Sequence, residues 1–99
     1  MRNRADNNQD EIVEKLRGIG CSVQVLSQVG NGFPDLLCGY RGVNYLLEVK
    51  GKRGVLSDYQ LEWHMFWNGQ VCIVRTFEDA RRMIEDGTAI ETIKEAIGE

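Results

Sequence analysis

Residues 34–50, PDLLCGYRGVNYLLEVK, are the most informative part of the chain about its fold. Apolar, β-branched and aromatic residues on both sides of Arg41-Gly42 are typical of two strands joined by a tight turn. The stretch therefore predicts a β-hairpin. With a two-residue turn, counting outward along both strands sets Asp35 directly opposite Glu48.

Opposed carboxylates on one face of a hairpin indicate a bound cation. Directly paired residues have Cβ atoms about 4.5–5.5 Å apart, so two like charges destabilise the hairpin unless something positive lies between them. Two carboxylate ligands, with the other positions left to water and phosphate, are typical of Mg²⁺ or Mn²⁺ sites for phosphodiester chemistry. Lys50 lies on the same strand face as Glu48, where an ammonium can orient water or neutralise charge on a phosphate. The alternative is a solvated hairpin with scattered charges.

Periodicity and turn residues predict the remaining elements. Helices are expected over 6–17, 57–67, from 76 and over 88–97, and strands over 21–29 and 70–75. Asp6 or Asn8 is the expected N-cap of the first helix, and Ser57 with Gln60 has the spacing of a capping box. The order describes an α/β fold: a mixed β-sheet flanked by helices, with an α-β-β-β-α-β core plus C-terminal helices.

Length, charge and cysteine content exclude several classes of protein. The 99 residues allow one domain, 1–99, and 42% hydrophobic residues suffice for a core. The net charge of −3 has the wrong sign for a non-specific nucleic-acid coat, although the acidic excess lies in 76–99. Three single cysteines without a C-x-x-C pair indicate neither a disulfide framework nor a zinc knuckle, and favour the cytoplasm. No apolar run approaches a membrane span of roughly 18 residues, and no glycine-rich loop indicates a nucleotide cofactor.

Two motifs, in this order, resemble a nuclease signature. GFPD at 32–35 and EVK at 48–50, with twelve residues between them, resemble the PD-(D/E)XK motif. Together with the end of the first helix at 18–23 and the capping element at 57–60, they resemble the small VRR-NUC domains of bacteria and phages over about residues 6–84. The resemblance implies a restriction-endonuclease-like fold, divalent-metal-dependent DNA cleavage, and dimeric action on branched DNA such as Holliday junctions.

The resemblance also implies a set of site residues. The implied catalytic residues are Asp35, Glu48, Lys50 and Gln9, and the implied ligands of Mg²⁺ or Mn²⁺ are Asp35, Glu48 and Val49. Carboxylates supply the hard oxygen ligands that both ions prefer.

Three further side chains are assigned with their alternatives. VRR-NUC domains usually place a glutamate on the first helix, and Gln9 stands at the matching position, with Glu11 as the competing candidate. A glutamine adds no negative charge, so a second metal would bind weakly or not at all. Both could instead be ordinary first-turn residues favoured by the helix dipole. Gln60 is assigned a supporting role at the site, and the alternative is only a capping bond to Ser57.

Basic residues near the predicted site are candidate DNA contacts. Arg41, Lys52 and Arg53 lie at the hairpin turn and in the loop that follows Lys50. Cations there could bind the phosphate backbone, although a solvated loop would have the same composition.

The aromatic residues of 59–67 follow a helical spacing. They offer more apolar surface than a helix with one buried face needs, which makes this helix or its neighbouring strand a candidate contact in a homodimer; the alternative is a generously packed core. Trp63 and Phe66 are assigned to the core or to an interface. His64 is the only histidine, which excludes a paired-histidine metal nuclease, and we expect no catalytic role for it.

The function predicted from these residues is metal-dependent endonucleolytic cleavage of DNA, with no membrane partner. The main alternative is a non-catalytic nucleic-acid- or protein-binding module that keeps the nuclease fold. Gln9 fits that alternative, whereas the complete set of Asp35, Glu48 and Lys50 argues against it.

Overall fold

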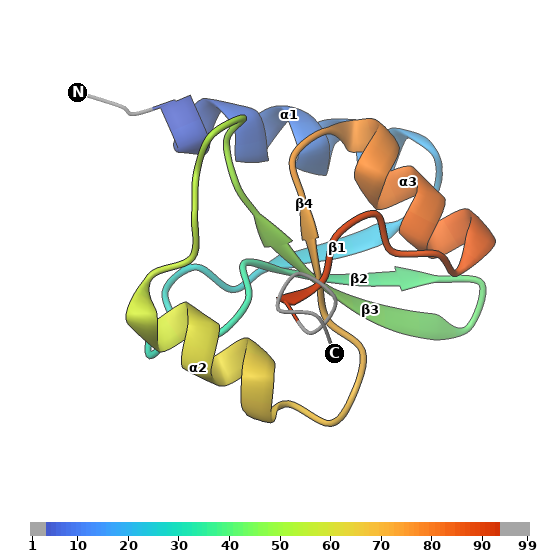
Figure 1. Cartoon of the computed structure of the whole chain (residues 1–99). Helices are drawn as coiled ribbons and strands as arrows, with labels where there is room; N and C mark the ends of the chain where they lie inside the picture. The colour runs from blue at the N-terminus through green and yellow to red at the C-terminus, as the bar shows by residue number, and fades with distance from the viewer. Residues whose placement is uncertain (1–3, 94–99) are drawn as a thin grey trace.

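Four strands and three helices follow one another in the computed structural model, which describes residues 4–93 (Figure 1). In chain order they are α1 (Arg4–Gly18), β1 (Ser22–Val25), β2 (Leu36–Tyr40), β3 (Val43–Val49), α2 (Asp58–Phe66), β4 (Cys72–Val74) and α3 (Phe77–Asp86). The predicted fold class, an α/β fold with a mixed sheet flanked by helices, is confirmed. No helix within the described range is long and apolar enough to cross a membrane.

The hairpin has the predicted register. Tyr40 pairs with Val43, and the ladder continues to Leu36 opposite Leu47, so one more step sets Asp35 opposite Glu48. Arg41 and Gly42 have φ angles of 51° and 82°, the positive pair that a type I′ turn requires. β1 pairs with β2 in the antiparallel sense, and β4 lies parallel to β3 at the other edge, in the order β1-β2-β3-β4.

The sheet has one apolar face and one polar site face. α1 and α3 lie together on one side of the sheet, and α2 lies on the other (Figure 1). Successive β3 side chains alternate between these sides, so Leu47 and Val49 enter the core while Glu48 faces the α2 side. The core holds Ile12, Val13, Leu16, Cys21, Leu36, Cys38, Leu47, Val49, Cys72, Val74, Ala80, Met83 and Ile84.

A close backbone contact holds α2 against the loop before β2. Gly32 has a φ angle of 82°, and a Cβ at this position would collide with the carbonyl group of Tyr59 in the first turn of α2. The rings of Phe33 and Trp63 meet edge to face, with centroids 5.1 Å apart. These contacts place the start of α2 beside Asp35 at the end of the same loop.

Two predicted boundaries near the N-terminus are wrong. The helix begins at Arg4, so Asp6 and Asn8 lie inside it instead of at its N-cap. The strand predicted over 21–29 ends at Val25, because the amide of Val29 donates to the carbonyl of Leu26 and the chain turns there.

The last predicted helix is also wrong over residues 88–92, whereas Ile93 is helical. Residues 88–92 are not helical, and the remainder of the range beyond 93 lies outside the described residues. The backbone of Glu91 forms a bridge with β4, where its carbonyl accepts from the amide of Ile73 at 2.9 Å. The outer edge of β4 would otherwise leave this amide of a buried residue unpaired, which costs more free energy than a short helix gains.

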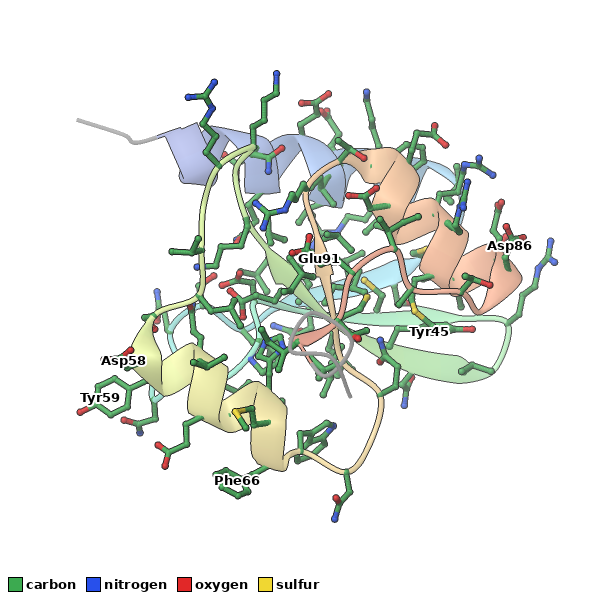
Figure 2. The ribbon with its side chains drawn as sticks, in the orientation of Figure 1. Tyr45, Asp58, Tyr59, Phe66, Asp86 and Glu91 are labelled. Carbon is green, nitrogen blue, oxygen red and sulfur yellow. The ribbon has the colours of Figure 1, made fainter. Side chains whose placement is uncertain are left out.

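The aromatic residues of α2 are only partly buried. Trp63 stacks on Trp67 with ring centroids 4.5 Å apart, but Phe66 is 76% exposed, so its assignment to the core of the chain is wrong. Figure 2 shows Tyr59 and Phe66 extending from α2 away from the sheet. An interface role for Phe66 stays a prediction.

Candidate active site

Asp35 and Glu48 approach each other where β2 begins and β3 ends. The Oδ2 atom of Asp35 accepts a hydrogen bond from the backbone amide of Val49 at 2.9 Å, which fixes the carboxylate against β3. Glu48 is fully buried, although its neighbours along the strand point into the opposite, apolar layer. A half-buried and a fully buried acidic side chain are therefore held together.

Gln60 connects the N-terminus of α2 to two of the predicted catalytic residues. Its Oε1 atom accepts from the Ser57 amide and from Lys50 Nζ, both at 2.8 Å, and its Nε2 atom donates to Glu48 Oε2 at 3.1 Å. The capping box is complete, because the Ser57 side chain also accepts from the Gln60 amide. The Gln60 side chain therefore caps α2 and contacts Lys50 and Glu48 at the same time, although the sequence alone left these two roles as alternatives.

Lys50 lies beside Glu48 and is held there from two sides. Its Nζ atom is 3.9 Å from Glu48 Oε2, and the bond to Gln60 directs it toward the carboxylates. Its backbone carbonyl accepts from Asn8 Nδ2 at 3.0 Å, and the same amide group reaches the carbonyl of Arg75 at 3.3 Å. The ammonium is thereby presented next to the buried acids.

Burial makes the two carboxyl groups resist ionisation. The pKa of Asp35 is raised to about 7, first by burial and then by the neighbouring Glu48 carboxyl, while the Val49 amide and Lys50 oppose the rise. The pKa of Glu48 is also raised, chiefly by burial. The pair consequently retains a proton near neutral pH, and a cation that displaces this proton would relieve the repulsion.

An unsatisfied oxygen atom of Glu48 makes the site suitable for a divalent ion. Oε1 of Glu48 is buried and accepts no hydrogen bond from any described residue. No group of three or more His, Cys, Asp or Glu side chains is arranged to hold a metal within residues 4–93. Asp35 and Glu48 therefore fit a hard ion that takes its other oxygen ligands from water, phosphate or backbone. Val49 could contribute only its carbonyl, since its side chain is aliphatic and lies in the core.

His64 lies beside Glu48, a position that the sequence did not predict. It is 1% exposed, and its Nε2 atom lies 3.7 Å from Oε1 of Glu48. Its pKa is lowered, first by burial and then by Lys50, while Asp35 opposes the change. The available signal was its position one helical turn after Gln60, which directs both side chains to the same side of α2.

On α1, the structure brings a different residue to the site from those predicted. Gln9 donates to Ser27 Oγ at 3.3 Å in the loop between β1 and β2, and Glu11 pairs with Lys15 at 2.9 Å on the exposed side. Asn8 instead reaches the backbone of Lys50. The sequence signal for this contact is the position of Asn8, four residues before Ile12. Residues four apart lie on the same side of a helix, so Asn8 faces the sheet as the core residue Ile12 does.

The predicted DNA-contacting residues fall into two separate places. Lys52 and Arg53 are exposed in the loop directly after the site. Arg41 stacks over Tyr40, 5.0 Å from the ring centroid, at the hairpin turn. The length of β3 separates this turn from Glu48, roughly 20 Å at about 3.3 Å per residue. A contact of Arg41 with DNA would thus lie far from the carboxylates.

Arg75 holds the loop that carries Lys52 and Arg53. Its Nη1 atom donates to the carbonyls of Gly51 at 2.7 Å and Gly54 at 2.8 Å. The other side of its guanidinium pairs with Glu91, at 2.9 Å and 3.2 Å. Figure 2 places Glu91 beside β4, so the segment after α3 supports this loop.

Comparisons with known proteins relate this chain to one kind of domain. No family model matches the chain, and no curated protein matches it. A solved structure described as "VRR_NUC domain" is 29% identical and superposes with a TM-score of 0.67. The match covers 85% of this chain and 97% of that chain, so the similarity extends over most of both chains.

Proposed function

The chain folds as a VRR-NUC domain, a nuclease-type domain, and on this premise we propose that it is a divalent-metal-dependent endodeoxyribonuclease that hydrolyses phosphodiester bonds. The observation that carries the proposal is the pair of carboxyl groups formed by half-buried Asp35 and buried Glu48, with the Lys50 ammonium held beside them. Fold similarity alone does not establish chemistry, so the proposal depends on these three side chains.

Each residue has a distinct task in the proposed reaction. Asp35 and Glu48, with the carbonyl of Val49, would hold Mg²⁺ or Mn²⁺, which when bound supplies Lewis-acid polarisation of the phosphate and a more acidic water. Lys50 binds the scissile phosphate and stabilises the negative charge that develops on its oxygens. Gln60 orients Lys50 and Glu48 through its two amide atoms.

Helix α1 contributes Gln9 in this proposal, as the resemblance implies, and this role requires its side chain to leave Ser27 Oγ, to which it donates in the structure. Glu11 is less suitable, because it pairs with Lys15 on the exposed side. Gln9 adds no charge, so the proposed site binds one metal ion more readily than two. A Gln9→Glu variant that binds Mn²⁺ more tightly would support this assignment.

The proposed substrate is branched DNA, cut by a homodimer. Lys52 and Arg53 would bind phosphates next to the site, and Arg41 would bind them farther away. One site completes one hydrolysis at a time, so symmetric incision of a four-way junction needs two copies related by a two-fold axis. The exposed aromatic side of α2 is the proposed contact between them. We place this enzyme in the cytoplasm, where buried free thiols such as Cys38 stay reduced.

The deciding experiment is cleavage of labelled linear, nicked, flap and four-way-junction DNA with Mg²⁺ or Mn²⁺. We expect metal-dependent incision of the junction, and no incision by the matched Asp35→Asn variant. Light scattering over a micromolar concentration range should show a dimer. DNA binding without cleavage by the unmodified chain in either metal would favour the non-catalytic module instead.

A further inference from the structure

The side chain of His64 is buried in a way that packing does not explain. Neither ring nitrogen has a hydrogen-bond partner among the described residues. Burying an imidazole without a partner costs about 1–3 kcal/mol, so a leucine of similar size would suit an ordinary core better. A cavity of about 260 Å³ also borders His64, next to Trp67 and Met83, so the ring does not serve tight packing. The cost indicates a role at the site.

The neighbour of His64 is the one carboxylate oxygen of Glu48 that nothing else holds. Gln60 Nε2 donates to Oε2 at 3.1 Å, whereas Oε1 accepts no hydrogen bond within residues 4–93 and lies 3.7 Å from His64 Nε2. Gln60 and His64 are one turn apart on α2, so one helix directs a nitrogen at each oxygen of the same carboxylate. The separation of 3.7 Å exceeds a hydrogen bond by about half an ångström, which a small rotation of either side chain removes.

We propose that His64 is a positioning residue that holds the Glu48 carboxylate, through Oε1, in the orientation that binds the divalent ion. The inference rests on the proposed function, since it concerns the same metal site. A hydrogen bond to Oε1 leaves a further lone pair on each oxygen, so donation from His64 does not compete with the ion. Hydrogen-bonding partners of ligating carboxylates commonly change metal affinity by 10–100-fold when they are removed.

Two variants of His64, with side chains of different length, test the proposal. His64→Gln keeps an N–H donor near the position of Nε2, whereas His64→Asn carries the same amide one carbon shorter and cannot reach Oε1. Calorimetric titration with Mn²⁺ should show binding about 10–100-fold weaker in His64→Asn and close to that of the unmodified chain in His64→Gln. Glu62→Gln, an exposed charge change on the same helix, is the matched control and should bind Mn²⁺ as before.

Cleavage supplies a second measurement that a purely structural role would not change. The rate of His64→Asn should be reduced at limiting Mn²⁺ and should recover at saturating Mn²⁺, with the melting temperature of the metal-free protein within a few degrees of the original. Equal Mn²⁺ affinity in His64→Asn and the unmodified chain would overturn the positioning role and leave the proposed nuclease intact. Absence of Mn²⁺ binding by the unmodified chain would overturn the proposed function itself, and the inference with it.

Discussion

The two faces of the sheet are built from the same strands but bury different kinds of side chain. Toward α1 and α3, Leu36, Leu47 and Val74 are completely buried among apolar neighbours. Toward α2, Glu48 is buried as deeply, but its neighbours are polar. One of them, His64, has no hydrogen-bond partner among the described residues. An apolar hollow of about 520 Å³, bordered by Phe33 among others, lies on the α2 side as well.

The difference shows how a small domain can support a costly site. Closely packed apolar residues on one face stabilise the fold, because each fully buried aliphatic side chain contributes about 1.5–3 kcal/mol. Desolvated carboxyl groups on the other face lower stability, and their pKa values are raised for that reason. Changes on the two faces should therefore affect different properties of the protein.

Replacing Glu48 by Gln should have the largest effect, and on activity alone. We expect cleavage to fall by about 10³-fold or more, because the loss of a metal ligand removes several kcal/mol of transition-state stabilisation. The metal-free protein should be as stable as before or more so, since one desolvated acid is gone. Gel assays with Mn²⁺ and thermal unfolding measure the two quantities. A variant that cuts at a comparable rate would place the metal site elsewhere.

Lys50→Met comes next, again on the site face. Turnover should fall by about 10²–10³-fold, since a contact made to the transition state is lost, while Mn²⁺ affinity changes by a small factor. Lys50→Arg should recover only part of the rate, because a planar guanidinium does not reproduce a compact ammonium. Single-turnover kinetics at saturating metal measure the loss. Unchanged turnover in Lys50→Met would reduce this residue to a surface charge.

Leu47→Ala, one residue from Glu48, should give the opposite pattern. Its side chain is completely buried, so truncation should lower the free energy of unfolding by about 2–5 kcal/mol. At a temperature where the variant is still folded, its cleavage rate should stay within about twofold of the original. Urea denaturation measures the stability. A severe loss of activity in the folded variant would show that the two faces are coupled more tightly than their packing indicates.

Gly32→Ala should affect both faces, because this residue holds α2 in place. The added Cβ meets the carbonyl of Tyr59, and the positive φ angle is unfavourable for alanine. We expect the free energy of unfolding to fall by about 1–3 kcal/mol. Mn²⁺ binding should also weaken, because the first turn of α2 moves away from Glu48. Gly30→Ala, which also has a positive φ but open space around it, is the control and should leave Mn²⁺ binding unchanged.

The pH dependence of stability should show the smallest effect. The folded protein binds a proton at Asp35 up to a pKa of about 7, against a reference value of 3.8, so folding takes up a proton between these values. The metal-free protein should therefore lose stability as pH rises from about 4 to 7, by about 1–2 kcal/mol after solvent screening. Chemical denaturation across this window measures the slope. In Asp35→Asn the slope should be reduced, and an equal slope would assign it to other groups.

Local pattern was sufficient for the hairpin and for part of the site. A two-residue turn at Arg41-Gly42 and the period of two along a strand determine which side chains oppose each other, without any distant contact. The capping box at Ser57 and Gln60 is likewise a short-range signal. Among the wrong predictions, the helix expected over 88–92 is replaced by a bridge from Glu91 to the distant Ile73, whereas the strand expected over 26–29 gives way to a local turn in which the amide of Val29 donates to Leu26.

The sequence by itself determined the α/β fold, the register of Asp35 against Glu48 and the side of the strand on which Lys50 lies. Three contacts depend on the packing of distant elements: Asn8 reaches the backbone of Lys50, Arg75 holds the loop after Lys50, and His64 lies beside Glu48. The physical reason is separation along the chain. Neighbouring residues are constrained by backbone geometry, which every sequence shares, whereas contacts between distant residues depend on how whole helices pack against the sheet.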